Sequence, residues 1–399
     1  SNLERGVAQW LDPAAPVFAR ELRRTGYATG HFGKWHMGGQ RDVSNAPVIA
    51  DYGFDRSLTN FEGMGAKLLP LTITPQDSAP KQIWADAVNL GTPVTWAMRS
   101  TITGGYVREA MRFIDRAAAT GQPFFINLWP DDPHSPWFPS LEHWSEDKRK
   151  RYLAVVDEMD DQLAPLLDRI RNDPSLRGNT LVVFCSDNGP EAGAGSTGGL
   201  RGGKGWLYEG GIRSPLIVWG PGLIADDCAG TSNDESVLCA LDLNRSLYSL
   251  TNTPLPEVAE PDGENRIETF LGRSTEGRIS PIFFRRPPDR PGFSKDSPDQ
   301  DNPDLAALEG DWKFLVNLDG SNAQLYDLAS DASESRNVAT EHADVAARLR
   351  KAVLAWNVTL PRDATDPSFP AGPLPSDAKG RKGAKGKNDG DTRGRTNPP

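Results

Sequence analysis

The chain has 399 residues, of which 37% are hydrophobic and 25% are charged. A chain of this length and composition is typical of a globular protein, and it can bury a sizeable core around one main sheet. The net charge of −10 at pH 7 argues against general binding to nucleic acid or to an acidic membrane, because polyanions repel an acidic chain. Any anionic substrate therefore needs a local site whose charges differ from the net negative charge of the chain.

Cysteine and leader patterns give little information about the compartment. Cys185, Cys228 and Cys239 lack zinc-binding or redox spacing, and three cysteines cannot all pair with one another. No apolar run is long enough to span a bilayer, and residues 1–20 contain no stretch typical of a signal peptide. The sequence starts at Ser1 and enters a helical pattern almost at once. We expect the natural start to lie elsewhere.

Helical and strand patterns alternate along the first part of the chain. Alternation of this kind predicts an α/β fold with a largely parallel sheet flanked by helices. Gly and Pro residues separate the segments, as expected at the ends of helices and strands. Helices are predicted over residues 16–25, 107–118 and 152–170, and strands over 28–32, 124–129, 180–185 and 215–219.

The second part of the chain has shorter apolar segments, which predict a smaller α+β domain. Strand-like pieces cover residues 269–271, 281–284, 312–316 and 324–328, and a helix is predicted over 342–356. We expect three regions: a catalytic domain over 1–265, a small domain over 266–360 and a disordered basic tail over 361–399. For the tail, a solvated terminus is preferred to a tether for polyanions.

Polar clusters follow three of the predicted strands. They cover residues 33–38, 131–136 and 187–189. In open α/β sheets, ligands bind in the crevice beyond the carboxyl ends of the strands. The sequence therefore predicts that these three clusters line one site.

The cluster after the third strand contains Asp187 and Asn188. A carboxylate and an amide oxygen are hard ligands that suit Ca²⁺ or Mg²⁺. An Asp-Asn-Gly sequence is also common turn chemistry, so by itself this motif favours a turn over a metal site.

The cluster after the first strand contains Lys34 and His36. In an extended segment this spacing puts both side chains on one side, where a fixed cation beside an imidazole suits an oxyanion and proton transfer. The alternative is an exposed lysine and a hydrogen-bonded structural histidine. For His31, inside the predicted strand, the structural alternative is preferred.

Two further segments carry candidate catalytic residues. Prolines on either side of His134 could fix that histidine rigidly in its loop, although a satisfied loop histidine is the alternative. A glycine-rich segment over residues 198–215 places Lys204 where backbone can approach an anion closely. Gly205 follows Lys204, so the segment does not match the phosphate-binding P-loop pattern.

These segments, in this order, resemble the sulfatase family of the alkaline phosphatase superfamily, in particular its arylsulfatases and N-acetylgalactosamine-6-sulfatases. The resemblance covers residues 16–221, and residues 310–314, 325–328 and 334–338 resemble the family's small terminal domain. It implies an alkaline-phosphatase-like fold and a hydrolase of sulfuric esters. It also implies a periplasmic or secreted location.

The resemblance assigns a role to each candidate residue. Asp187 and Asn188 would be two ligands of one Ca²⁺ ion, with two more carboxylates from an N-terminal Asp pair. Lys34 and His36 would hold a formylglycine nucleophile made from Cys or Ser. His134 and Lys204 would contact the sulfate and share proton donation to the leaving oxygen. Fixed cations that meet developing negative charge usually supply a large catalytic contribution.

The family's nucleophile motif, Cys or Ser followed by Pro or Ala at the third position and Arg at the fifth, is absent. None of the three cysteines is followed by the required Arg, and the serine segment over residues 78–82 ends in Gln. The N-terminal Asp pair is absent as well. We expect a single N-terminal truncation to explain both losses, which would leave this chain nearly inert, with weak calcium binding and a main sheet lacking its first strand.

The complete protein is therefore predicted to cleave sulfate esters, with sulfated carbohydrates or aryl sulfates as substrates. Two alternatives stay open. A phosphoester or phosphonate monoester hydrolase would use a related site, and a noncatalytic binder of sulfated glycans would keep the pocket without the chemistry. Neither a nucleic-acid partner nor a membrane span is expected, and fold alone does not fix the leaving group.

Overall fold

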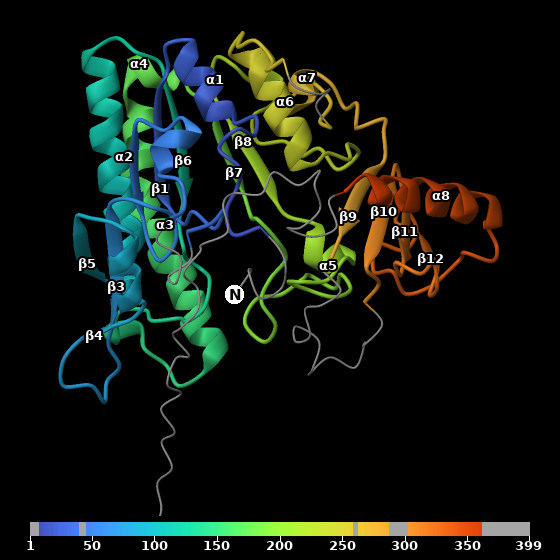
Figure 1. Cartoon of the computed structure of the whole chain (residues 1–399), viewed down its shortest axis with the longest axis horizontal. Coiled ribbons are helices and arrows are strands. Elements are labelled where there is room, and N and C mark those ends of the chain that lie inside the picture. The colour runs from blue at the N-terminus through green and yellow to red at the C-terminus, as the bar shows by residue number, and fades with distance from the viewer. Residues whose placement is uncertain (1–7, 40–44, 258–261, 287–301, 361–399) are drawn as a thin grey trace, which may run out of the picture.

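The structure is a computed structural model that describes residues 8–39, 45–257, 262–286 and 302–360 (Figure 1). The helices are α1 (Phe18–Arg24), α2 (Ile102–Ala119), α3 (Lys148–Asn172), α4 (Pro174–Arg177), α5 (Glu209–Ile212), α6 (Ala240–Leu250), α7 (Ile267–Phe270) and α8 (Ala343–Thr359). The strands are β1 (Ala28–Gly33), β2 (Arg56–Thr59), β3 (Lys67–Thr72), β4 (Lys81–Gln82), β5 (Val94–Met98), β6 (Phe124–Trp129), β7 (Val182–Cys185), β8 (Leu216–Trp219), β9 (Ile282–Arg285), β10 (Leu305–Glu309), β11 (Trp312–Val316) and β12 (Gln324–Asp327).

The main sheet has six strands and is largely parallel. Its order is β4-β3-β2-β1-β6, with β5 paired to β3, and only the β3–β4 pair is antiparallel. Strand β1 lies parallel to both β2 and β6, and its last residue, Gly33, is in register with Thr59 and Trp129. The carboxyl ends of these strands therefore share one edge of the sheet, which confirms the predicted fold class.

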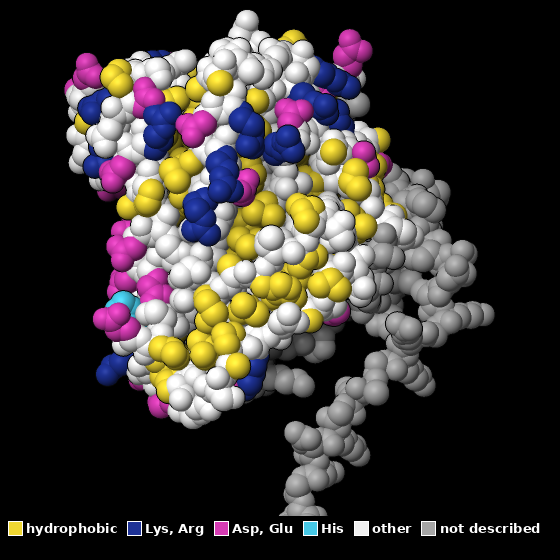
Figure 2. Space-filling model, turned by 90° about the vertical axis from the view of Figure 1, so that its left-hand side faces the viewer, with side chains coloured by type: hydrophobic (Ala, Val, Ile, Leu, Met, Phe, Trp, Pro, Cys, Tyr) yellow, Lys and Arg dark blue, Asp and Glu magenta, His cyan; other side chains and the backbone are white. Residues whose placement is uncertain are grey.

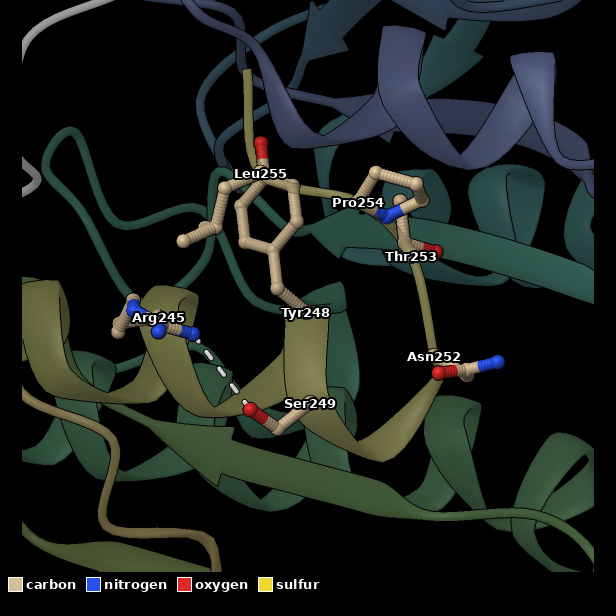
Figure 3. Close-up of a pocket in the computed structure, with 7 residues that line it drawn as sticks. All are labelled: Arg245, Tyr248, Ser249, Asn252, Thr253, Pro254 and Leu255. Carbon is tan, nitrogen blue, oxygen red and sulfur yellow. Dashed lines mark hydrogen bonds between the residues drawn. The ribbon is translucent and has the colours of Figure 1, made fainter. Parts of the chain in front are cut away.

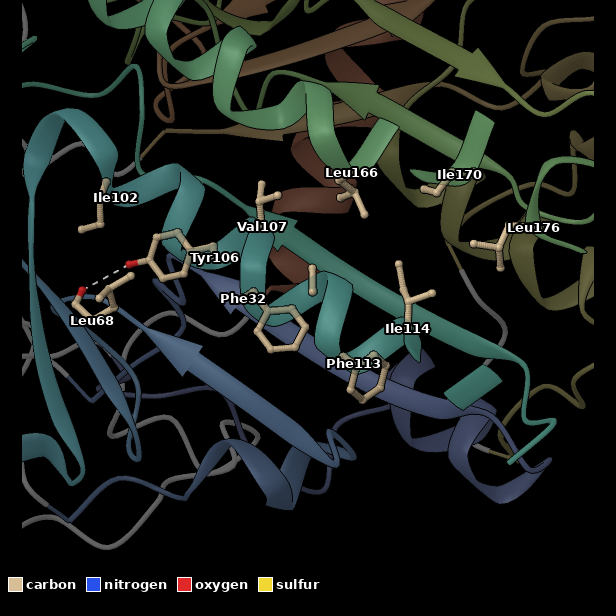
Figure 4. Close-up of a cluster of buried hydrophobic side chains, with 11 residues drawn as sticks. Phe32, Leu68, Ile102, Tyr106, Val107, Phe113, Ile114, Leu166, Ile170 and Leu176 are labelled. Atoms are coloured by element: carbon tan, nitrogen blue, oxygen red, sulfur yellow. Dashed lines mark hydrogen bonds between the residues drawn. The ribbon is translucent and has the colours of Figure 1, made fainter. Parts of the chain in front are cut away.

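Helix α2 covers this sheet because its apolar residues recur at helical spacing on one face. Tyr106, Val107 and Phe113 are almost fully buried in a cluster with Phe32 of β1. Figure 4 shows these side chains between the sheet and the helices, with the Tyr106 hydroxyl donating to the Leu68 carbonyl at 3.3 Å. Burial of each large apolar side chain contributes about 1.5–3 kcal/mol to stability, so this cluster fixes the strand ends that carry the site.

Strand β7 differs from its predicted placement. It pairs antiparallel with β8 in a separate two-stranded sheet rather than joining the main sheet. Within the described residues, no strand pairs with the outer edge of β6, where the six-stranded sheet ends. Apolar side chains of the small sheet are correspondingly open to solvent: Phe184 is 46%, Leu216 42% and Ile217 58% exposed. The sequence pattern predicted a strand here but not its neighbours.

A four-stranded antiparallel sheet forms the C-terminal part, in the order β12-β11-β10-β9, with α8 packed on it. Leu305, Phe314, Leu349 and Val353 are fully buried between the sheet and this helix. These elements confirm three of the four predicted short strands and the helix. The prediction of a strand over residues 269–271 was wrong, because this short apolar run lies in and just after the single helical turn α7.

The predicted domain boundaries at residues 265 and 360 stay a prediction, and the tail over 361–399 lies outside the described residues. No helix in the described part of the chain is long and apolar enough to cross a membrane. Figure 2 shows a band of hydrophobic side chains across the face that lies to the left in Figure 1, with basic side chains gathered above it. Hydrophobic surface is thus not confined to the small β7–β8 sheet.

Candidate functional site

The main chain at Lys34 is fixed where β1 ends. Its amide donates to the Trp129 carbonyl at 2.7 Å, which links β1 to the end of β6. A Cβ atom on Gly33 would lie 1.9 Å from the same carbonyl oxygen, and Gly33 has φ +119. Only glycine fits this close approach, so the glycine before Lys34 sets the start of the loop.

His31 supports this turn from inside the protein. It is fully buried, its Nε2 lies 3.0 Å from the Lys34 carbonyl, and its ring contacts Trp35 and Trp129 edge-on. A carbonyl only accepts hydrogen bonds, so Nε2 carries the proton and Nδ1 is left without a hydrogen-bond partner. Burial lowers the pKa of His31 to about 3. His31 is therefore a neutral structural histidine.

The placement of the Lys34 and His36 side chains on one side of the chain stays a prediction, although the backbone leaves the extended region at His36. His36 has φ +53, in the left-handed region, and its side chain is exposed. The physical reason is Trp35, which is 3% exposed and packs into a cluster with Tyr52 and Phe54. The chain turns after this anchor and forms an isolated bridge from Gly38 to Trp10. The roles of Lys34 and His36 stay a prediction.

The loop after β6, which carries His134, is built on a buried ion cluster. The Arg99 guanidinium lies 3.0 Å from Asp131 Oδ2 and 3.0 Å from Asp132 Oδ1, with all three side chains at most 4% exposed. Arg99 also donates to the His134 carbonyl at 3.1 Å, and Thr103 donates to Asp132 at 2.8 Å. These contacts fix both the start of the loop and the backbone at His134.

The His134 ring is oriented by its own loop. Its Nδ1 lies 2.7 Å from the Ser135 carbonyl, which can only accept, so Nδ1 is the protonated nitrogen. In the neutral ring, Nε2 is then the free acceptor, and in the imidazolium it carries the transferable proton. The Trp137 indole donates to the Pro133 carbonyl at 2.7 Å and closes the loop from the other side.

After β7, residues 186–189 form the turn that the Asp-Asn-Gly sequence allows. The Ser186 hydroxyl donates to the Asn188 carbonyl, and the Asn188 amide nitrogen donates to the Gly189 carbonyl, both at 2.8 Å. This orientation uses the amide nitrogen of Asn188 and not its Oδ1. The Asp187 side chain is exposed. The turn therefore exists, and its two hard oxygen donors stay compatible with metal binding.

The glycine-rich segment packs directly on this turn. The Lys204 amide donates to the Pro190 carbonyl at 3.0 Å, and the Gly189 amide donates to the Gly211 carbonyl at 2.9 Å. The Ser135 hydroxyl donates to Glu191 at 3.1 Å, which ties the His134 loop to the same turn. Hydrogen bonds thus connect the His134 loop, the turn after β7 and the glycine-rich segment.

The electrostatic environment of Lys204 identifies its neighbours. The pKa of Lys204 is lowered, first by burial and then by the positive charge of Lys34, while the carboxylates of Glu191, Asp187 and Asp131 act in the opposite direction. Charges from the loops after β1, β6 and β7 therefore all act on one ammonium group. The loops after these strands thus act on one side chain even though β7 belongs to a different sheet, and the site that they were predicted to line stays a prediction.

Sequence reasoning missed Arg99 and Glu191. Two adjacent aspartates in an otherwise apolar segment require a counter-ion or strong hydrogen bonds when buried, and that requirement was the available signal for Arg99. Nothing in the sequence indicates that the partner lies 32 residues upstream of Asp131. Among the described residues, no three His, Cys, Asp or Glu side chains are grouped so as to hold a metal ion.

A pocket of about 390 Å³ lies elsewhere, at the end of α6. Figure 3 shows its lining, in which Arg245 donates to the Ser249 hydroxyl at 3.5 Å and Tyr248 forms one wall. None of the predicted site residues lines it. The candidate site is therefore the convergence of loops around Lys204 and not this pocket.

Comparison with known proteins identifies the family. The sequence model of the sulfatase family matches residues 12–253. The chain belongs to the sulfatase family. It is thus a member of the alkaline phosphatase superfamily of hydrolases, as its sequence predicted.

Its relatives include N-acetylgalactosamine-6-sulfatase of Sus scrofa, which is 32% identical over 66% of this chain and 50% of the relative. N-acetylgalactosamine-6-O-sulfatase of Bacteroides thetaiotaomicron is 26% identical over 85% of this chain and 76% of the relative. The solved structure of Ps i-CgsB with k-i-k-neocarrahexaose has a TM-score of 0.69 and 25% identity, covering 88% of this chain and 77% of that one. The chain spans about half the length of the mammalian sulfatases that it matches.

Replacing Arg99 by Met tests the ion cluster below His134. We expect Arg99→Met to lower the free energy of unfolding by about 3–5 kcal/mol, because it leaves two buried carboxylates without their counter-ion. Urea unfolding measures this change. The matched control is Arg23→Met, which removes an ion pair whose arginine is 53% exposed and should cost less than about 1 kcal/mol. Equal losses in the two variants would contradict the assignment.

The neutral state of His31 predicts a pH dependence of stability. The folded pKa of about 3 lies below the unfolded value of about 6.5, so between these values only the unfolded state binds the proton. His31 therefore makes stability fall as the pH decreases from 6.5 toward 3, by about 1.5 kcal/mol between pH 6.5 and 5. The free energy of unfolding of His31→Gln, measured with urea at several pH values, should lack this pH-dependent contribution. An unchanged slope would show that His31 is not the responsible group.

Proposed function

We propose that the complete protein hydrolyses sulfate esters of carbohydrates. Family membership supports a sulfuric ester hydrolase, and the convergence of Lys34, Lys204 and His134 supports an oxyanion site at the strand ends. The observation that carries the proposal is that the loops of these residues are joined by hydrogen bonds: the Lys34 amide donates to the Trp129 carbonyl, the Lys204 amide donates to the Pro190 carbonyl, and the Ser135 hydroxyl donates to Glu191. Burial and the charge of Lys34 also lower the pKa of Lys204, and an anion bound near both lysines would offset this effect.

Lys34 and Lys204 would stabilise the negative charge of the sulfate group. Like charges that approach each other disfavour their charged forms, so a bound anion removes part of this cost. As the ester bond breaks, charge builds up on the leaving oxygen, and fixed cations that need no reorganisation stabilise it most effectively. The hydrogen bond from the Lys204 amide to Pro190 fixes the backbone from which one of these cations extends.

His134 would donate a proton to the leaving ester oxygen, a role that Lys204 would share. Because Nδ1 is held by the Ser135 carbonyl at 2.7 Å, the transferable proton of the imidazolium lies on Nε2. A fixed ring presents this proton in one direction, which is the geometric requirement for general acid catalysis. Arg99 would contribute indirectly, by holding the His134 backbone.

Asp187 and Asn188 would provide two of the ligands of a Ca²⁺ ion. Their oxygen donors fit this hard cation, which takes six to eight oxygen ligands, so the described residues supply part of a coordination sphere. A bound Ca²⁺ would add positive charge opposite the sulfate. Removal of the metal by a chelator should therefore abolish activity.

The family relationship also implies a formylglycine nucleophile, which Lys34 and His36 would hold. No segment of the 399 residues has the required motif. We propose that a segment outside this sequence supplies the nucleophile and the remaining metal ligands, as the partial coverage of its relatives supports. The outer edge of β6, with which no strand of the described residues pairs, and the exposed apolar side chains of β7 and β8 offer that segment a place beside the site.

The names of the relatives support a carbohydrate substrate. Two of them are named for the removal of sulfate from N-acetylgalactosamine, and the Ps i-CgsB structure contains a neocarrahexaose. A sulfated sugar or an aryl sulfate is therefore the substrate class to test first. Hydrolysis of a phosphate ester, or binding of a sulfated glycan without turnover, would be an alternative outcome of the test below.

The Lys204 side chain provides the test. In the complete protein, Lys204→Ala should lower kcat for an aryl sulfate about 100- to 1,000-fold, because it removes a cation that stabilises the transition state. The control is Lys81→Ala, since this lysine is 68% exposed and its ammonium group pairs with Asp77, four residues earlier in the chain. Its rate should not change.

Initial rates on matched aryl sulfate, aryl phosphate and sulfated sugars decide between the alternatives. Faster turnover of the phosphate would favour the phosphoester hydrolase. Saturable binding of sulfated glycan with no turnover, in protein whose formylglycine is confirmed by mass spectrometry, would favour the binder. Unchanged kcat and KM in Lys204→Ala would remove Lys204 from the site.

A further inference from the structure

Helix α5 (Glu209–Ile212), which lies within the glycine-rich segment, begins at a buried charged residue. Glu209 is 4% exposed, and its Oε1 accepts from the Lys313 ammonium at 2.8 Å. Lys313 lies on β11 of the C-terminal sheet and is fully buried. A buried lysine and a buried glutamate from parts of the chain 104 residues apart thus form a direct ion pair between the site loops and the C-terminal sheet.

A second buried carboxylate completes the cluster. Glu334 is fully buried, its Oε2 accepts from the Glu209 amide at 2.6 Å, and its Oε1 lies 3.6 Å from the Lys313 ammonium. Glu334 also has φ +53, a backbone conformation that non-glycine residues adopt only where surrounding contacts fix it. The side chain and the first amide of α5 are therefore both held by the C-terminal part.

Arg201 adds a second connection from the glycine-rich segment. Its guanidinium donates to the Tyr326 hydroxyl at 2.9 Å and to the Glu334 carbonyl at 3.1 Å, and it lies over the Tyr208 ring at 4.0 Å. The Tyr208 hydroxyl donates to Gln324 of β12 at 2.7 Å. Both ends of the segment that carries Lys204 are thus attached to the C-terminal sheet.

The same short helix contacts the turn that carries Asp187. The Gly189 amide donates to the Gly211 carbonyl at 2.9 Å, and a Cβ atom on Gly189 would lie 1.8 Å from the Gly210 carbonyl oxygen. The two backbones are thus packed closely enough that only glycine fits at position 189. A shift of α5 would therefore displace both the Lys204 segment and the Asp187 turn.

We propose that Glu209, Lys313 and Glu334 form a buried positioning cluster through which the C-terminal sheet holds Lys204 and the Asp187 turn in place. All three side chains are at most 4% exposed, and they act through the backbone of α5. The alternative is that the cluster only contributes to global stability. The catalytic part of this inference rests on the proposed function, whereas the mechanical part does not.

Hydrogen exchange of the 399-residue chain tests the mechanical part directly. Lys313→Met removes the ammonium and keeps a long side chain, so exchange in residues 187–190 and 198–212 should accelerate at least tenfold. Exchange in β1 and β6 should stay unchanged. Glu209→Gln, which keeps the size of the side chain, should accelerate the same two segments and serves if Lys313→Met does not fold. Wild-type exchange in both segments, or equal acceleration of all segments, would overturn the proposal.

Two further variants make the test specific. Arg348→Met removes an exposed ion pair to Glu309 in the same C-terminal part, in which the arginine is 53% exposed, and should leave exchange in both segments unchanged. The double variant Lys313→Met with Glu209→Gln should accelerate exchange no more than Lys313→Met alone, because both residues act through one contact. Additive acceleration would contradict a shared cluster.

Activity of the complete protein tests the catalytic part. Lys313→Met should lower kcat for sulfate ester cleavage about 10- to 100-fold, the range typical of residues that orient catalytic groups, while KM changes less than about threefold. Unchanged kcat in a folded variant would contradict the positioning role. Failure of the wild-type protein to release sulfate would instead contradict the proposed function, and the exchange experiment would still decide the cluster.

Discussion

The site depends on holding two like charges near each other. Lys34 and Lys204 come from different loops, and burial together with the charge of Lys34 lowers the pKa of Lys204. Such an arrangement is unfavourable by itself, and it persists because the backbones of both residues are fixed by hydrogen bonds of 2.7 and 3.0 Å. Carboxylates nearby offset part of the repulsion, and an anion placed between the two ammonium groups would offset it further.

The remaining structure supplies the rigidity that this arrangement requires. Beneath the His134 loop, Arg99 pairs with two buried aspartates. Behind the Lys204 segment, Lys313 lies between two buried glutamates. A buried ion cluster adds little stability compared with apolar packing, but it fixes the orientation of the groups it joins. In both places the cluster supports a loop that carries a candidate catalytic side chain.

Much of this fold follows from sequence periodicity. The strand over residues 124–129 and the strand over 312–316 have the predicted bounds, because each is a mostly apolar run, flanked by prolines in the first case and by Asp311 and Asn317 in the second. The run over 269–271 was too short to distinguish a strand from a helical turn. The pairing of β7 with β8 could not be predicted either, since local pattern reveals a strand but not its neighbour.

The candidate site was predictable in part for the same reason. Lys34, His134, Asp187 and Lys204 were identifiable because polar residues that directly follow strands, or lie among glycines, stand out from an apolar background. Arg99, Lys313 and Glu334 were not, since each acts through a partner distant in sequence. The left-handed backbone at His36 also escaped prediction, because it follows from the burial of Trp35 in a cluster assembled by the fold.

A crystal structure of the complete protein with a bound sulfated sugar tests the central claim most directly. The account predicts sulfate oxygens within hydrogen-bonding distance of the Lys34, Lys204 and His134 side chains, and a Ca²⁺ ion coordinated by oxygens of Asp187 and Asn188. A sulfate group bound away from these side chains, or a metal ion with ligands that include neither Asp187 nor Asn188, would contradict it.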